Sequence, residues 1–280
     1  MNHSDTYLKT KDFLVSGESF DLVYDKGLDL LKTVPQPKLE ELGRYYESED
    51  YISHTDEKKG LLSSVYQLVK KWSLRNKTKL IFTQNSGVGS LLDVGAGTGD
   101  FLKVAKESAW KVQGMEPNTK ARSLALEKGI VLKNSLDEFK GEQFDVVTLW
   151  HVLEHIPNLD ETISILTDLV KPGGSLIIAV PNYKSFDATY YGNFWAAYDV
   201  PRHLWHFSKI AIEELFSVNF KMEKIKPMVF DSFYVSLLSE KYKTGKSFSL
   251  KAFWIGLKSN LKGKTSKEYS SHIYCLRKVK

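Results

Sequence analysis

The order of apolar and polar residues changes character near residue 90. From there, short runs of consecutive apolar residues alternate with longer segments in which apolar residues recur every three or four positions. The continuous runs are typical of strands buried on both faces, and the amphipathic segments are typical of helices. The alternation therefore predicts a parallel sheet covered by helices on both faces. The predicted strands are 90–95, 110–116, 130–134, 144–150, 175–182, 220–230 and 272–279.

Two segments fall outside this alternation. Residues 1–80 precede it and contain candidate helices, and residues 183–207 are rich in aromatic side chains without a clear period. We predict an N-terminal extension with cap helices over 1–80. The main domain, 81–280, would carry a lid insertion at 183–207 and a basic helical insertion at 235–268.

Composition limits the class of protein. The chain has 280 residues, of which 42% are hydrophobic and 26% are charged, as in ordinary globular proteins. No apolar run approaches the roughly 20 residues that span a bilayer, and the first residues lack an apolar signal core, so we expect a cytoplasmic protein. The single cysteine, Cys275, excludes an internal disulfide and a Cys-rich metal cluster. Residues 241–280 hold eleven Lys or Arg and one acid, Glu268, so the basic charge is concentrated there.

A glycine-rich turn joins the first predicted strand to the next helix. In LLDVGAGTGD (91–100), glycines at 95, 97 and 99 permit a tight turn and close approach of a ligand to the backbone. The second strand ends in Glu116, where a carboxylate can accept hydrogen bonds from both hydroxyls of a ribose. The dinucleotide signature requires a third glycine where this chain has Asp100, so the pattern suits a nucleoside ligand without a pyrophosphate.

Four motifs in this order resemble those of the class I S-adenosylmethionine-dependent methyltransferases of types 11, 12 and 23. They are LLDVGAGTGD (91–100), GMEPN (114–118), FDVVTLWHVLEHIPN (144–158) and LVKPGGSLIIAVPN (169–182). The resemblance implies an α/β, Rossmann-like fold with a doubly wound, mostly parallel sheet of seven strands, the last antiparallel. It also implies S-adenosylmethionine as cofactor, S-adenosylhomocysteine as product, and no metal.

The resemblance implies a cofactor site as well. The glycine-loop backbone would hold the methionine and ribose portions, and Glu116 would take the ribose hydroxyls. Pro117 would pack by the adenine, and residues 134–136 would border its ring. Trp150 and His151 would lie beside the methyl donor. The residues expected at the cofactor are Asp93, Gly95, Ala96, Gly97, Gly99, Glu116, Pro117, Asn134, Ser135, Leu136, Trp150, His151, Tyr46 and Tyr51.

HVLEH (151–155) has the H-x-x-E-H spacing of an inverted zinc-protease helix. However, it follows a predicted strand directly, and Pro157 comes two residues after it, which does not suit a helix interior. We therefore predict no metal there. Ligands bind at the carboxyl ends of strands in an open sheet, so His151 and His155 either shape the pocket wall or supply a base.

The lid insertion allows two interpretations. It is either an aromatic core under a structural loop with an Asp199–Arg202 salt bridge, or an acceptor site in which Arg202 or His203 engages an acidic or hydroxyl group. Its D-V-P-R-H-L stretch resembles a subset of the family, which favours the second. The catalytic candidates are His151, His155, His203, Arg202 and Asp199.

The N-terminal stretch 20–37 resembles a small zinc-binding hairpin found in this subset, but Asp25 and Leu28 stand where that pattern has cysteines. We expect a hairpin remnant over 15–37 without its metal. Tyr46 and Tyr51 follow, and they either close over the donor or pack against the main domain.

Residues 247–264 combine apolar residues at helical spacing with lysines on another side. Such a helix either makes a weak contact with an anionic membrane surface or packs as a lid with a solvated lysine face. No basic and aromatic stripe extends into the main domain, so we expect no nucleic-acid partner.

We predict a methyltransferase that moves the methyl group of S-adenosylmethionine to a small-molecule acceptor, with O-, N- and C-methylation all open. Alternatives are an NAD(P)-dependent oxidoreductase of Rossmann type and a non-catalytic module that binds S-adenosylmethionine or S-adenosylhomocysteine.

Overall fold

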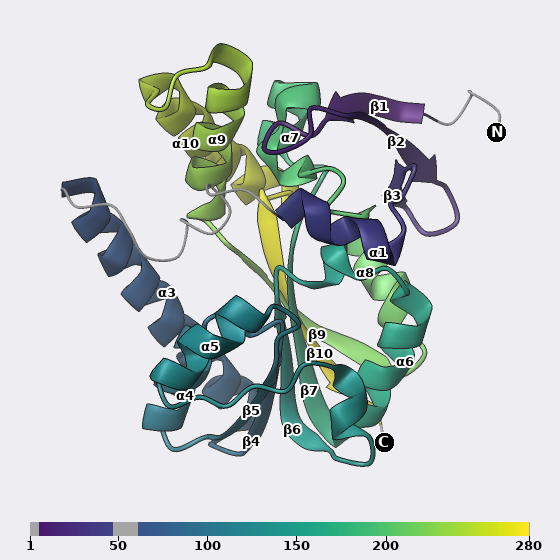
Figure 1. Ribbon diagram of the computed structural model, residues 1–280, viewed down its shortest axis with the longest axis vertical. Coiled ribbons are helices and arrows are strands. Elements are labelled where there is room, and N and C mark those ends of the chain that lie inside the picture. Colours follow the sequence, from purple (N-terminus) through teal and green to yellow (C-terminus); the bar gives the residue numbers. More distant parts are fainter. Residues whose placement is uncertain (1–5, 47–60, 280) are drawn as a thin grey trace.

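The computed structural model describes residues 6–46 and 61–279 (Figure 1). Its main sheet has six strands in the order β5-β4-β6-β7-β10-β9, and β4, β5, β6 and β7 run parallel. β10 is antiparallel to both of its neighbours, as the resemblance implies for the last strand. The strands are β4 (Ser90–Val94), β5 (Lys111–Met115), β6 (Phe144–Trp150), β7 (Val170–Pro181), β9 (Phe220–Pro227) and β10 (Ser271–Lys278).

The predicted strand count of seven is wrong by one in the described residues. The segment 130–134 forms only a single bridge, Met115 to Lys133, at the outer edge of β5. The backbone of Lys133 bonds to Gly114 and Glu116, each at 3.0 Å. The Asn134 N–H then donates to the Glu138 side chain at 2.9 Å, because the chain turns into a short helix there. Pairing therefore stops after one residue.

Helices cover both faces of the sheet, as the pattern predicted. Leu91 packs into a cluster with residues of α3 and α4, while its neighbour Leu92 packs into a second cluster with residues of α6 and α8. Figure 1 shows these helix groups on opposite sides. The helices are α3 (Leu61–Asn85), α4 (Asp100–Glu107), α5 (Thr119–Glu127), α6 (Leu159–Leu169) and α8 (Lys209–Phe216). Helix α3 runs without a break through the predicted boundary at residue 80, so that boundary lies inside a helix.

The N-terminal extension forms a second, antiparallel sheet in the order β1-β2-β3-β8. Its strands are β1 (Thr6–Lys11), β2 (Ser19–Asp25), β3 (Leu30–Val34) and β8 (Trp205–His206), followed in the chain after β3 by α1 (Leu39–Leu42) and the 3₁₀ turn η2 (Gly43–Tyr46). The hairpin is present, and the Asp25 carboxylate holds its turn by accepting from the N–H groups of Gly27 and Leu28. Because β8 comes from the lid insertion, the extension and the lid form one unit.

The lid contains α7 (Phe186–Tyr191) and the 3₁₀ turns η5 (Gly192–Phe194) and η6 (Ala196–Tyr198). The basic insertion is a helix pair, α9 (Asp231–Thr244) and α10 (Leu250–Ser266), which starts four residues earlier than predicted. The 3₁₀ turns η3 (Leu136–Phe139) and η4 (Leu153–His155) complete the fold. None of the helices in the described residues has the length and apolar character needed to cross a membrane.

Candidate functional site

The glycine loop between β4 and α4 needs glycine for two different reasons. Gly95, Gly97 and Gly99 have φ angles of +69°, +53° and +74°, in the left-handed region that favours glycine. A Cβ on Gly95 would lie 2.4 Å from Val152 Cγ2, so the loop packs tightly there. A Cβ on Gly97 would meet nothing within 4 Å. The backbone of Gly97 therefore faces space that a ligand can occupy.

Glu116 is in direct contact with this loop. Its Oε2 accepts from the Gly97 N–H and its Oε1 accepts from the Asn118 N–H, both at 2.9 Å. A carboxylate oxygen can accept more than one hydrogen bond, so both oxygens keep capacity for a ligand hydroxyl. The Glu116 N–H also donates to the Lys133 carbonyl oxygen, which aligns Pro117 with residues 134–136 along one sheet edge. The residues that the sequence predicted to bind the ribose and the adenine thus lie close together.

Two ionisable side chains behind the loop, Asp93 and Lys77, affect each other's pKa. Asp93 is buried and accepts from Thr148 Oγ1 at 2.6 Å, and its burial raises its pKa to about 7. Lys77 of α3 places its Nζ 4.3 Å from the centre of the Trp150 ring. Burial lowers the pKa of Lys77, against the opposing effect of Asp93 and Asp231. Sequence reasoning missed Lys77, because it lies in no motif and reaches the site only through the packing of α3.

His151 lies at the end of β6 between two carboxylates. Its Nδ1 is 3.3 Å from Glu154 Oε1, and its Nε2 is 3.2 Å from Asp231 Oδ2. Burial alone would lower the pKa of His151, but Asp231 and Glu154 outweigh it and raise this pKa to about 10. His151 is therefore an imidazolium at neutral pH. Asp231 was missed from the sequence, since it stands eighty residues away at the start of α9.

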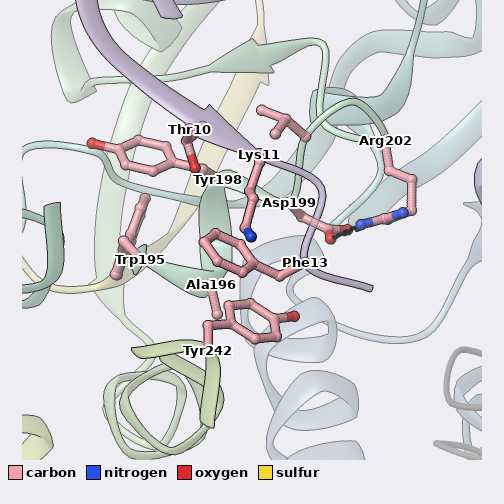
Figure 2. Close-up of a pocket in the computed structure, with 10 residues that line it drawn as sticks. Thr10, Lys11, Phe13, Trp195, Ala196, Tyr198, Asp199, Arg202 and Tyr242 are labelled. Carbon is pink, nitrogen blue, oxygen red and sulfur yellow. Dashed lines mark hydrogen bonds and ion pairs between the residues drawn. The ribbon is translucent and has the colours of Figure 1, made fainter. Parts of the chain in front are cut away.

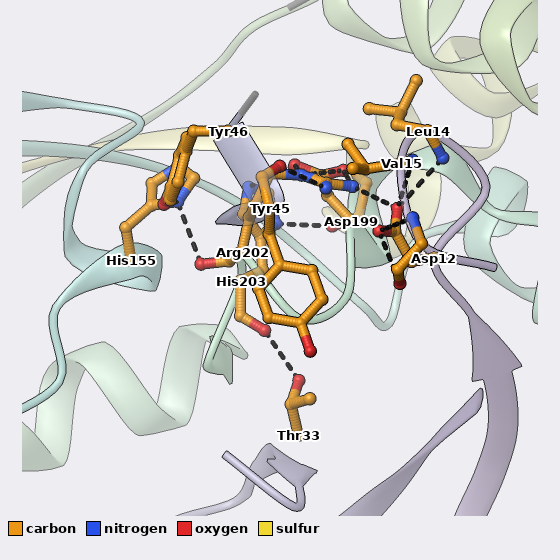
Figure 3. Close-up of polar contacts among 12 residues, drawn as sticks. Asp12, Leu14, Val15, Thr33, Tyr45, Tyr46, His155, Asp199, Arg202 and His203 are labelled. Carbon is orange, nitrogen blue, oxygen red and sulfur yellow. Dashed lines mark hydrogen bonds and ion pairs between the residues drawn. The ribbon is translucent and has the colours of Figure 1, made fainter. Parts of the chain in front are cut away.

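His155 and His203 form a histidine pair (Figure 3). Their rings meet edge to face with centres 4.5 Å apart. Nδ1 of His155 lies 3.0 Å from the Arg202 carbonyl oxygen and 3.1 Å from Tyr46 Oη. Burial, and then the charge of His203, lower the pKa of His155 to about 4, so its imidazole is neutral. Tyr46 thus contacts the main domain through His155, whereas Tyr51 lies outside the described residues.

Glu154, His155 and His203 each offer a potential ligand atom, and these atoms lie within 4.8 Å of one another. The spacing alone would admit a cation. The His151 imidazolium, however, already supplies a positive charge to the Glu154 carboxylate. The negative charge of Glu154 is therefore balanced by His151.

Arg202 is part of a buried ion network (Figure 3). Its side chain is 1% exposed, and Nε donates to both Asp199 oxygens at 3.0 Å. Nη1 donates to the Tyr45 carbonyl oxygen and Nη2 to Asp12 Oδ1, each at 2.9 Å. All three nitrogens are thus engaged within the protein. This is the Asp199–Arg202 salt bridge of the first interpretation, and the acceptor role of Arg202 stays a prediction.

A cavity of about 10 Å³ lies beside this network, between β1 and the lid (Figure 2). Thr10, Phe13, Asp199 and Tyr242 are among the side chains that line it. This volume corresponds to about one water molecule. It is too small for a methyl acceptor, so the acceptor would have to approach elsewhere.

The glycine loop at the end of β4, its bonded acid at the end of β5 and the antiparallel β10 define a class I S-adenosylmethionine-dependent methyltransferase fold. A family model described as a methyltransferase domain matches residues 51–223, more than half of the chain. The chain belongs to that family.

Curated relatives match only part of this chain. It is 35% identical over 102 residues to the ubiquinone biosynthesis O-methyltransferase of Shewanella halifaxensis, which covers 33% of this chain and 43% of that protein. A Shewanella sp. (strain ANA-3) protein of the same name is 32% identical over 139 residues, covering 44% of this chain and 59% of the relative. The matched part is thus about half the length of these relatives.

Solved structures share the fold at low identity. The 1,6-didemethyltoxoflavin-N1-methyltransferase of Burkholderia thailandensis is 15% identical, with a TM-score of 0.52 over 94% of this chain and 96% of its own. The [4+2]-cyclase SpnF is 19% identical, with a TM-score of 0.51 over 73% of this chain and 80% of its own. Since one of these is a cyclase, the fold alone does not decide the reaction.

Proposed function

We propose that this protein transfers the methyl group of S-adenosylmethionine to a small-molecule acceptor. The observation that carries the proposal is the hydrogen bond between Gly97 and Glu116, which joins two cofactor motifs at the carboxyl end of the sheet. His151 lies at the end of the adjacent strand β6. In the reaction, an acceptor lone pair forms a bond to the methyl carbon as the carbon–sulfur bond breaks, and S-adenosylhomocysteine leaves. The protein's main task is alignment of the two reactants.

The cofactor roles follow the contacts around the loop. The backbone at 95–99 would hold the methionine and ribose portions, with Asp93 buried behind it. Glu116 would accept from the ribose hydroxyls. Pro117 and residues 134–136 would enclose the adenine, and Trp150 would form the wall beside the sulfonium.

Lys77 supplies the charge that the methionine carboxylate needs. Its Nζ lies over Trp150, at the same end of the sheet as the glycine loop. A charged hydrogen bond of this kind contributes about 1.5–3 kcal/mol, or roughly ten- to hundredfold in affinity. The part of α3 that carries Lys77 is thus assigned to cofactor binding.

Binding of two different ligands can distinguish this role of Lys77 from a general effect on the cofactor site. Calorimetry should show that Lys77→Met weakens S-adenosylhomocysteine binding about tenfold or more. It should leave 5′-methylthioadenosine, which lacks the amino-acid portion, unchanged. Lys79→Met, on the exposed side of the same helix, is the matched control. Equal loss for both ligands would contradict the role of Lys77, while failure of the unmodified protein to bind either would contradict the proposed function.

His151 is our candidate for handling the acceptor proton, with His155 as a neutral residue of the wall and His203 packed beside it. An acceptor hydroxyl or amine could take the place of Asp231 at Nε2. The imidazolium would then lose a negatively charged neighbour. Loss of that charge lowers the pKa of His151. His151 could then exchange a proton near neutral pH while Glu154 holds Nδ1.

A transfer assay distinguishes this function from the alternatives. Methyl-labelled S-adenosylmethionine incubated with a panel of phenols, amines and carboxylic acids should yield labelled product and S-adenosylhomocysteine. Glu116→Ala should abolish cofactor binding. Binding of NAD(P) in place of S-adenosylmethionine would favour the oxidoreductase, and binding without transfer to any acceptor would favour the binding module.

A further inference from the structure

Helix α10 packs against the protein mainly through small side chains and presents several of its large apolar side chains to solvent. Its buried residues are Ala252, Ile255, Gly256, Ser259 and Gly263. Its outward residues Leu250, Phe253, Trp254 and Leu261 are each more than half exposed. A surface helix normally buries its large apolar stripe, so the arrangement here is reversed. Contiguous exposed apolar residues mark an interaction surface.

The packing contacts prevent α10 from rotating about its axis to bury its apolar face. A Cβ on Gly256 would lie 2.8 Å from the Phe233 ring and 2.9 Å from its Cα, so α9 can approach only a glycine there. A Cβ on Gly263 would lie 2.8 Å from the Tyr269 ring. Ser259 Oγ donates to the buried Asp187 carboxylate at 2.6 Å. The small face is thus required for packing, and the apolar face must point outward.

The exposed charge next to the apolar face is positive, although Lys251 also pairs with the buried Glu240 of α9 at 3.4 Å. Helix α10 contains four lysines and no acid. At 100° per residue, Lys251, Lys258 and Lys262 project within about 40° of one another, along one side of the stripe formed by Leu250, Trp254 and Leu261. An apolar stripe bordered by lysines complements a surface that is apolar below and negatively charged above.

Neighbouring residues extend the apolar face. Phe248, just before α10, is exposed, and the Phe253 ring lies 5.1 Å from that of Phe233 on α9. Tyr234 of α9 is also exposed. Figure 1 shows α9 and α10 together at one end of the molecule, beside α7. This end offers a surface of two helices.

We propose that α10 docks in the plane of an anionic membrane surface. Phe253, Trp254 and Leu261 enter the boundary between headgroups and acyl chains, and the flanking lysines contact lipid phosphates. Helix α9 packs on α10 and begins at Asp231, which contacts His151, so docking holds the candidate site close to the membrane. The docking does not rest on the proposed function.

Vesicle co-sedimentation of the full chain tests the proposal. The protein should bind phosphatidylcholine vesicles that contain phosphatidylglycerol at low salt, and binding should fall as salt screens the lysines. The double variant Phe253→Ser/Trp254→Ser and the triple variant Lys251→Gln/Lys258→Gln/Lys262→Gln should each reduce binding about tenfold or more. The control is Val131→Ser/Val218→Ser, which removes two exposed apolar residues elsewhere and should bind as before.

Three results would overturn the inference: no binding to anionic vesicles at low salt, equal binding of the double variant and the control, or equal binding to pure phosphatidylcholine. Sedimentation velocity tests whether a second copy of the chain occupies this face instead of a membrane. A dimer that the double variant dissociates would assign this face to a second copy of the chain. Unchanged circular dichroism and thermal midpoint of each variant show that the surface, and not the fold, was altered.

Discussion

At the scale of single residues, the surroundings of His151 decide the charge that its imidazole carries. The same residue type has opposite properties four positions later. His155 is half-buried beside His203 and is neutral, while His151 lies between Asp231 and Glu154 and is protonated. The difference comes from the neighbouring carboxylates, because burial alone would lower both pKa values.

We predict that Asp231→Asn lowers the pKa of His151 from about 10 towards its ordinary value, since a negative charge is lost. NMR titration of the His151 ring proton measures this shift. A raised folded-state pKa stabilises the fold fully below the unfolded value of about 6.5, and this stabilisation is lost as pH rises through about 10. The variant should therefore lose less stability than the unmodified protein between these pH values. An unchanged His151 titration would contradict the contact.

The buried charge of Arg202 also depends on its partners, which are Asp12, Tyr45 and Asp199. We predict that Arg202→Met destabilises the protein by about 3–5 kcal/mol, because Asp12 and Asp199 would remain as uncompensated buried charges. Urea denaturation measures the loss. The triple variant Arg202→Met/Asp12→Asn/Asp199→Asn should recover part of it. A stable Arg202→Met protein that has lost only turnover would instead support the original acceptor-site interpretation.

At the scale of elements, two glycines of the same loop are predicted to have different roles. Gly95 is required for packing, and Gly97 is expected to contact the ligand. Gly95→Ala should destabilise the fold by roughly 1–3 kcal/mol, because its Cβ would collide with Val152 and its φ is positive. Gly97→Ala has open space and should cost only about 1 kcal/mol from its φ, yet it should abolish S-adenosylhomocysteine binding. Thermal unfolding and calorimetry on both variants measure the two effects. Intact cofactor binding by Gly97→Ala would move the ligand away from this loop.

Helix α10 illustrates what a hydrophobic period can and cannot predict. Its period correctly predicted a helix with apolar and basic sides. The period did not predict which side packs, and the packing interpretation assumed that the apolar side would be buried. The close approach of Phe233 to Gly256 selected the small side instead.

At the scale of the whole molecule, three histidines with lowered pKa values are neutral bases in the folded protein. Burial lowers the pKa values of His155 and His272 to about 4 and that of His206 further. Between pH 4 and about 6.5 the unfolded chain therefore binds more protons than the folded chain, and stability rises with pH. We predict that the free energy of unfolding falls as pH drops through this window. His155→Gln/His272→Gln should flatten that slope in urea titrations, and an unaltered slope would assign it to other groups.

The sequence by itself determined the parts of this protein that depend on local spacing. The alternation of apolar runs and amphipathic segments specified the order of strands and helices, because each element's period is a property of neighbouring residues. The glycine loop and Glu116 could be paired in advance, since consecutive parallel strands end at the same sheet edge.

Only the tertiary structure decided the partners of buried charges. Arg202 meets Asp12 at a separation of 190 residues, His151 meets Asp231 across eighty, and Lys77 reaches Trp150 from a helix outside every motif. A charge is buried only where an opposite charge or a ring compensates it, and which one does so depends on how distant segments pack. Local pattern therefore predicted the candidate cofactor site, and packing specified the lid, the protonation of His151 and the outward face of α10.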